Sequence, residues 1–303
     1  MFNNLSISNV LKFRTFYLML IPAIIYYGVV HYYPMFGAQI AFKDFRFNLG
    51  IMDSPWVGFK HFLDFFSAAS FTQILTNTLL ISFYKLIFGF PAPILFALLL
   101  NEVLHTNFKK FVQTVSYLPH FISWVVLGGV FMQLLSPTSG PVNIILEFLG
   151  IDSIYFLGDN SWFRSTLAWT AIWKGLGWGS IIYFAALSSI DTALYEAAEI
   201  DGANRFHKMV YITIPSMTPV ITIMFIFAVG GIINDDFDQI FNMYSPAVYE
   251  SGDVIGTYVY RKGLVGMEFS YATAVGLFKN VIGFALIIVT NKIVKKISDY
   301  SLW

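Results

Sequence analysis

Six long apolar runs dominate the 303-residue sequence and leave little choice of fold. Each holds about 20 or more mainly apolar residues, which is the length that a helix needs to cross the hydrocarbon core of a bilayer. None of the runs contains Asp or Glu. Strands of outer-membrane barrels are shorter and alternate in polarity, so the runs predict helices. The predicted spans are 16–36, 74–100, 112–135, 162–187, 216–234 and 271–290.

Charge and cysteine content narrow the class of protein further. Charged residues make up 12% of the chain, about half of their usual share in a soluble domain. The 18 basic and 18 acidic residues balance, so we expect no nucleic-acid partner. Cysteine is absent from the sequence, which excludes disulfides and thiolate metal sites. These features predict an all-α integral membrane protein surrounded by lipid.

The basic residues between the spans predict the orientation in the membrane. Six spans place both termini on the same side, and that side carries nine basic residues against six on the other. We therefore expect both termini to be cytoplasmic. The nine are Lys12, Arg14, Lys109, Lys110, Arg205, Lys208, Lys292, Lys295 and Lys296.

The chain divides near residue 70. Residues 1–70 read as an uncleaved anchor followed by an outer segment that mixes aromatic and charged residues. Residues 71–303 hold five spans and are expected to form the working core. Prolines near residues 91 and 119 should break or bend the second and third spans.

The cytoplasmic loop at 188–215 has the pattern of two short helices joined by a turn. Asp191 is a good N-cap for a helix over 193–200, and Gly202 can reverse the chain after it. A second short helix should then run over 203–211, before the next span begins.

One face of this loop is apolar. Phe206 and Met209 are three residues apart, so both should point from one helix face toward the cytosol. Such a face suits docking in a groove of a partner protein, and it equally suits an amphipathic helix resting on lipid. The small side chains of Ala197 and Ala198 allow another backbone to approach closely.

The loop motif resembles the EAA loop of ABC importer permeases. It reads Glu196-Ala197-Ala198, three residues, Gly202, nine residues, Ile212, one residue, Ile214-Pro215. The segment Asp201-Gly202-Ala203 is similar to the sugar-importer version, and Ile214 replaces the usual Leu. The aromatic stretches at 33–37 and 54–58 resemble the branch that imports oligosaccharides or polysaccharide fragments.

This resemblance implies a fold and a mechanism. It implies a type I permease core with an extra N-terminal helix, placed in the bacterial cytoplasmic membrane. The loop would be a coupling helix that contacts a cytoplasmic ATPase dimer, and ATP and Mg would bind there, with no cofactor on this chain. A second permease subunit in a heterodimer, an extracellular solute-binding protein and an oligosaccharide substrate complete the implied partners. The coupling residues by motif position are Glu196, Ala197, Ala198, Asp201, Gly202 and Phe206.

Three lysines, Lys85, Lys174 and Lys279, fall near the middle of predicted spans, where a charge costs about 2.5–3.5 kcal/mol even on a lenient scale. They could line the pathway and meet an anionic substrate. They could instead pair with the second permease, with acidic residues at 235–238, or with helix carbonyls.

Aromatic and acidic residues supply further candidates. Trp169 and Trp173 share a stripe on the fourth span with Trp162, and Tyr183 follows; they could stack on sugar rings or simply pack at the lipid interface. Asp235 and Asp236 are expected at the outer end of span five. They could line a gate, contact the binding protein, bind a cation or belong to a solvated loop. Neither the acids nor the scattered histidines have metal-ligand spacing, so no metal site is expected.

Two other functions compete with a permease. An ion-coupled secondary transporter would more readily show carboxylates within the spans and repeated halves, and neither is present. An integral membrane enzyme would need acids or histidines clustered at one membrane face, and only the acids at 235–238 come close. The sequence contains no phosphate-binding G-x-x-x-x-G-K-[ST] motif, so ATP hydrolysis belongs to another chain.

Overall fold

The computed structural model describes residues 13–297, and within that range the regular structure is helical. Strand-type pairing there is limited to two isolated bridges, Lys43 with Trp56 and Arg46 with Gly50. The all-α prediction is therefore confirmed for the described chain. Lys12 and both chain ends, on which the orientation argument partly rests, lie outside the described residues.

Two compact units divide the chain. The first comprises the residues up to Phe66 together with Lys262–Leu277, and the second comprises Ser67–Arg261 together with the chain from Phe278 onward. The helices of the first unit, apart from the start of α18, are α2 (Arg14–Tyr27), η1 (Gly28–Tyr32), α3 (Tyr33–Met35), η2 (Phe36–Phe42), α4 (Gly50–Asp53) and α5 (Lys60–Phe66).

Unit 1 is a long apolar helix followed by a small folded segment. The helix is continuous over Arg14–Phe42 although Pro22 lies inside it. In the segment after it, Lys43 is 2% exposed because its ammonium donates at 2.8 Å to the carbonyls of Ile51 and Met52. These bonds satisfy a buried charge, so the segment that follows the long helix is a packed structure rather than a linker.

Unit 2 carries the remaining helices. They are α6 (Phe71–Tyr84), η3 (Lys85–Gly89), α7 (Pro91–Asn101), α8 (Thr106–Tyr117), η4 (Leu118–Phe121), α9 (Trp124–Leu134), α10 (Pro141–Phe148), α11 (Asn160–Ser188), α12 (Thr192–Ile200), α13 (Arg205–Lys208), η5 (Met209–Thr213), α14 (Ile214–Gly230), α15 (Phe237–Met243), η6 (Pro246–Val248), α16 (Tyr249–Gly252) and α17 (Ile255–Val259). Helix η7 (Tyr260–Val265) and helix α18 (Phe269–Ile297) each belong to both units.

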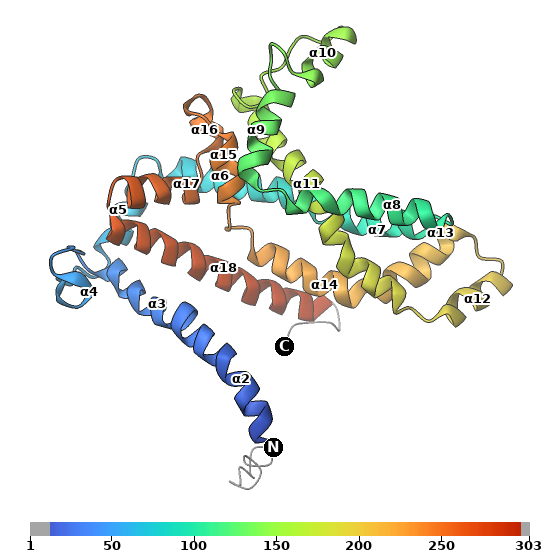
Figure 1. Cartoon of the computed structure of the whole chain (residues 1–303), viewed down its shortest axis with the longest axis horizontal. Coiled ribbons are helices and arrows are strands. Elements are labelled where there is room, and N and C mark those ends of the chain that lie inside the picture. Colours follow the sequence, from blue (N-terminus) through green and yellow to red (C-terminus); the bar gives the residue numbers. More distant parts are fainter. Residues whose placement is uncertain (1–12, 298–303) are drawn as a thin grey trace. The chain divides into compact units, whose positions relative to one another are not determined.

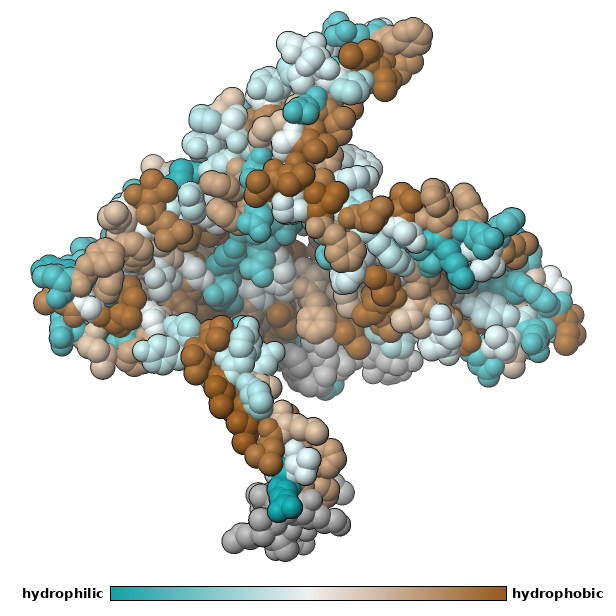
Figure 2. Space-filling view, viewed as in Figure 1, coloured by the Kyte–Doolittle hydropathy of each residue, from teal (hydrophilic) through white to brown (hydrophobic). Residues whose placement is uncertain are grey.

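Four helices of the described chain are long and apolar enough to cross a membrane. They are Arg14–Phe42, Phe71–Asn101, Arg205–Gly230 and Phe269–Lys296. A fifth span results if the bent pair Thr106–Phe121 and Trp124–Leu134 is one broken span. Brown, apolar side chains run along one side of the helix Arg14–Phe42 (Figure 2).

Helix α11 has the length of a span but not the apolar character. Its 29 residues would extend about 43 Å. It is less apolar than the helices above because it contains Arg164, Lys174 and four tryptophans. In unit 2 it packs against α6, α7, α8 and α14, so protein rather than lipid contacts much of its surface (Figure 1).

Of the two predicted bends, the one near residue 119 is present and the one near residue 91 is not, because Phe71–Asn101 runs on as one helix. Pro119 lies in the short 3-10 helix η4, and the helices on either side of it make an angle of 105°. Pro91 begins α7 directly after the π-helical segment η3. Proline lacks an amide hydrogen, so it is tolerated at these positions and disrupts regular hydrogen bonding around them.

The core of unit 2 depends on small residues between helices. A side chain at Gly177 of α11 would collide with the backbone carbonyl of Ser116 in α8. A Cβ atom at Gly175, two residues earlier on the same helix, would meet no atom within 4 Å. The glycine cluster of α11 therefore serves close packing at one position and leaves open space at another.

We expect Gly177→Val to destabilise the protein by about 1–3 kcal/mol, because α8 and α11 must separate to admit the new side chain. Gly175→Val is the matched control on the same helix and should cost far less. Thermal unfolding of both variants in detergent measures the difference. Equal stability of the two variants would contradict the close packing.

Candidate functional site

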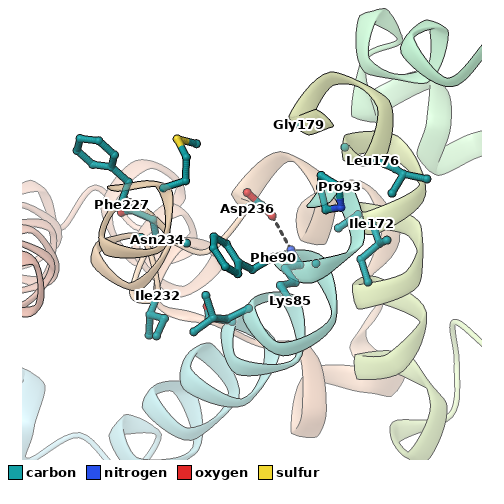
Figure 3. Close-up of a pocket in the computed structure, with 18 of the residues that line it drawn as sticks. Lys85, Phe90, Pro93, Ile172, Leu176, Gly179, Phe227, Ile232, Asn234 and Asp236 are labelled. Carbon is teal, nitrogen blue, oxygen red and sulfur yellow. Dashed lines mark hydrogen bonds and ion pairs between the residues drawn. The ribbon is translucent and has the colours of Figure 1, made fainter. Parts of the chain in front are cut away.

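A cavity of about 410 Å³ lies within unit 2, in the size range of small-ligand sites. Its walls come from α6, η3 and α7 on one side, α11 on another, and α14 with the chain that follows it on the third (Figure 3). Most of the lining is apolar or glycine. The polar residues in the lining are Ser82, Lys85, Tyr183, Asn234 and Asp236.

Lys85 and Asp236 form an ion pair in this cavity. The lysine Nζ lies 2.6 Å from Asp236 Oδ2 and 2.6 Å from Gln239 Oε1. Gln239 is fully buried and donates in turn to the carbonyl of Leu167 and to Thr170 Oγ1 of α11. The Lys85 ammonium is thus held between a carboxylate and a fixed amide oxygen.

Lys279 and Asp235 form a second ion pair, which does not line the cavity. The Asp235 side chain is 1% exposed and also accepts the backbone N–H of Gly256. Neighbouring aspartates therefore have different surroundings, because Asp235 is enclosed while the Asp236 side chain is 56% exposed.

Lys174 interacts with backbone rather than with an acid. Its Nζ donates to the carbonyls of His120 and Ile122 at 3.0 and 2.6 Å, and it lies 5.3 Å from the centre of the Trp124 ring. Those carbonyls sit at the 105° break of the α8–α9 pair, where regular helical bonding stops. The lysine supplies donors that the broken helix lacks.

The tryptophan stripe of α11 lies apart from the cavity. Trp169 stacks on Phe88 with ring centres 6.5 Å apart, and Trp173 meets Phe131 edge-on at 5.6 Å. Neither lines the cavity, whereas Tyr183, which is 3% exposed, does. Of the candidates on the substrate pathway, Lys85, Tyr183 and Asp236 line this cavity, and Asp235 and Lys279 pair with each other outside its lining.

The loop at 188–215 forms a helix–turn–helix hairpin (Figure 1). Asp191 caps α12 by accepting the N–H of Ala193, as predicted. Gly202 follows α12 with φ of +79°, and the amides of Gly202 and Ala203 bond to the carbonyls of Glu199 and Ala198. This is the Schellman arrangement that favours glycine, which confirms the predicted turn.

The motif residues occupy the outside of the hairpin. Glu196, Ala197, Asp201, Gly202 and Phe206 are exposed, and Ala198 is half-buried. Phe206 is 64% exposed, so its ring is free to contact a partner. In Figure 2 the end of unit 2 that carries the hairpin is rich in hydrophilic side chains.

Two side-chain contacts tie the hairpin together. Lys208 Nζ lies 2.5 Å from Glu199 Oε1 and holds the pKa of that carboxyl below its usual range, through the hydrogen bond and then the charge. Tyr195 Oη and Thr213 Oγ1 are 2.9 Å apart. Each contact joins α12 to the helix that follows the turn.

The second half of the hairpin departs from the prediction in two ways. It is not a separate short helix, because α13, η5 and α14 run on as one helix over Arg205–Gly230. Pro215 lies in the first turn of α14, where the sequence predicts the start of the next span, and the helix continues through it. Met209 begins the π-helical segment η5 and packs inward on the cluster around Met217. Phe206 therefore does not share an exposed apolar face with Met209, although the spacing predicts that it does.

Sequence reasoning missed several residues of the cavity. Gln239 was not predicted, although it follows the acidic cluster and is the fixed partner of Lys85. Phe90 of α7 and Phe227 of α14 also belong to the lining of the cavity. Apolar residues on spans give no signal that separates a cavity wall from a packed core. Between residues 13 and 297, no cluster of three or more His, Asp or Glu side chains suited to a metal is present.

The fold and these features define an α-helical, multi-pass membrane protein with an exposed helical hairpin and a largely apolar cavity that contains an ion pair. Comparison with known families then gives the particular class. Residues 89–298 match the family described as binding-protein-dependent transport system inner membrane component, and the chain belongs to this family. It is a transport component, which decides against an integral membrane enzyme and a secondary transporter.

Individual relatives agree with the family. The chain is 41% identical over 287 residues to the polygalacturonan/rhamnogalacturonan transport system permease protein YteP of Bacillus subtilis, covering 95% of this chain and 89% of that one. It is also 41% identical over 287 residues to protein LplB of the same organism. A solved chain of a bacterial alginate ABC transporter, in complex with alginate pentasaccharide-bound periplasmic protein, superposes with a TM-score of 0.88 at 39% identity, over 97% of this chain and 99% of that chain.

Proposed function

We propose that this chain is a permease subunit of an ATP-driven, binding-protein-dependent importer of acidic oligosaccharides. The observation that carries the proposal is the similarity over nearly the whole chain to the alginate transporter, whose described role is import of the acidic polysaccharide alginate. The relative named for polygalacturonan transport also handles an acidic polysaccharide. A substrate of this kind presents carboxylates, and Lys85 is a cation in a cavity of the right size.

The proposed topology has six spans with both termini in the cytoplasm. The four apolar helices and the broken pair account for five spans, and α11 supplies the sixth. Residues 1–70 would then be an anchor with an outer segment, and residues 71–303 the core that moves during transport. The count of basic residues supports this orientation.

The α12–α13 hairpin is proposed as the contact for a cytoplasmic ATPase dimer, which binds ATP and Mg. An exposed Phe206, an open turn at Gly202 and small residues at 197 and 198 suit insertion into a cleft. The contacts between α12 and the following helix would transmit the motion of the ATPase into α14. A second permease subunit and an extracellular solute-binding protein complete the assembly.

The candidate pathway residues fall into two proposed groups. Lys85, Tyr183 and Asp236 would face the substrate, because they line the cavity. Five others, placed in ring contacts or backbone and ion-pair contacts away from it, would support the pathway walls. These are Trp169, Trp173, Lys174, Asp235 and Lys279.

Reconstitution tests the function. The permease pair, the ATPase and the binding protein are placed in proteoliposomes with ATP inside, and uptake of labelled trigalacturonate and of an alginate trisaccharide is followed. We expect ATP-dependent uptake of at least one acidic probe, and little uptake with a non-hydrolysable ATP analogue. Uptake of neutral oligosaccharides alone would overturn the acidic substrate class.

A further inference from the structure

We propose that Lys85 binds a carboxylate of the transported sugar, and that this carboxylate replaces Asp236 as the counter-ion of the lysine. This inference rests on the proposed function and assigns its charge selectivity to one exchangeable ion pair. A neutral sugar would leave the pair intact, whereas an acidic sugar would take the place of Asp236 at the lysine.

The position of Lys85 is the first step of the argument. Of the three lysines within the spans, Lys85 lines the cavity, while Lys174 and Lys279 do not. Its side chain is 16% exposed, so the ammonium is reachable from the cavity yet shielded from most water. Shielding strengthens its attraction for an anion.

Asp236 is held loosely enough to be exchanged. It precedes α15 but makes no side-chain cap bond to that helix, and its side chain is 56% exposed. Figure 3 shows its carboxylate meeting Lys85 at the edge of the cavity. Asp235 provides the contrast, because it is enclosed and bonded to both Lys279 and the Gly256 amide.

Gln239 keeps the lysine in place during such an exchange. Its Oε1 accepts from Lys85 while its amide is anchored to Leu167 and Thr170 of α11. When Asp236 moves away, Lys85 retains this partner and its direction. An incoming carboxylate can then form a charge-assisted hydrogen bond with an ammonium that is already oriented, so little side-chain entropy is lost.

The rest of the lining fits a sugar ring. Phe90 and Phe227 offer apolar faces for the C–H surfaces, and Ser82 and Asn234 offer hydrogen bonds to hydroxyls. These groups do not distinguish an acidic sugar from a neutral one of the same shape. The charge at position 85 is the feature that does.

The test compares trigalacturonate with its fully methyl-esterified form, which has the same backbone without the charges. Binding of each to the purified permease–ATPase complex, without the binding protein, is measured by equilibrium dialysis. We expect Lys85→Gln to weaken trigalacturonate binding at least about tenfold and to leave the ester within about twofold. Lys85→Arg should retain most of the binding, and Asp236→Asn should tighten trigalacturonate severalfold by freeing the lysine.

The double variant Lys85→Gln with Asp236→Asn guards against misfolding, because it removes the pair without leaving an unpaired charge. It should bind trigalacturonate as weakly as Lys85→Gln alone. Equal losses for both probes in Lys85→Gln, or unchanged binding of trigalacturonate, would overturn the role of Lys85. A wild-type transporter that takes up no acidic probe in the vesicle experiment would instead overturn the proposed substrate class.

Discussion

Asp235→Ala is expected to lower the free energy of unfolding by about 3–5 kcal/mol, the largest stability effect we foresee for a single change in this protein. The Asp235 carboxylate is 1% exposed and bonded to Lys279 and to the Gly256 amide. Removing it leaves a cation in a weakly hydrated site and an amide without its acceptor. Denaturation of the detergent-solubilised protein, monitored by tryptophan fluorescence, measures the loss.

The double variant Asp235→Leu with Lys279→Met is the control for this pair. It replaces both charges by apolar groups of similar size, so most of the lost stability should return. A double variant as unstable as Asp235→Ala would show that the aspartate acts through the Gly256 amide instead. Unchanged stability of Asp235→Ala would contradict the buried ion pair.

Gly202→Asp and Phe206→Ala are each expected to reduce ATP-driven uptake at least about tenfold while the protein still inserts in the membrane. A Cβ atom at Gly202 would meet no atom within 4 Å, so a side chain there would collide only with a partner that covers the turn. It would also strain the backbone at φ of +79°. Phe206→Ala removes an exposed aromatic of the kind that dominates protein interfaces.

Tyr211→Ala is the matched control for Phe206→Ala. Tyr211 is an aromatic residue of the same continuous helix and is 74% exposed, but it is not part of the motif contact. Uptake by Tyr211→Ala should stay near the wild-type rate. Co-purification of the ATPase should be lost with Phe206→Ala and retained with Tyr211→Ala. Full uptake by both motif variants would contradict the coupling contact.

Helix type and helix ends were largely readable from the sequence, since long apolar runs, Asp191 and Gly202 act through local rules. The character of α11 was harder to judge. It was predicted as a span from its length and lack of acids, yet Arg164 and Lys174 make it the least apolar of the long helices. Its environment depends on neighbouring helices, which a single segment does not reveal.

The partners of the three lysines could be named only as alternatives. Asp235 and Asp236 are adjacent in the sequence, and choosing which of them meets Lys85 and which meets Lys279 requires the tertiary fold. The link from Lys174 to carbonyls at the broken span is equally non-local. Residues that bind backbone leave no complementary charge in the sequence to find.

A regular 3.6-residue period predicts which side chains share a helix face only up to the next π-helical segment. Segments of this kind at Gly28–Tyr32, Lys85–Gly89, Met209–Thr213 and Tyr260–Val265 each contain a turn with one residue more than an α-helical turn. A regular 3.6-residue period therefore misplaces side chains beyond each of them. Met209, the first residue of one of these segments, also packs inward, although the spacing places it on the face of Phe206.

The segment that begins with Lys85 also has a consequence for how this helix can vary. A π turn absorbs an inserted residue so that the helix before it and the helix after it keep their facing surfaces. Loss of one residue from 86–88 would restore an ordinary α turn while leaving α6 and α7 in their packing positions. Elsewhere in the span, the same deletion would rotate every following side chain by about 100°. This turn is thus the point at which the helix can change its length by one residue at the lowest structural cost.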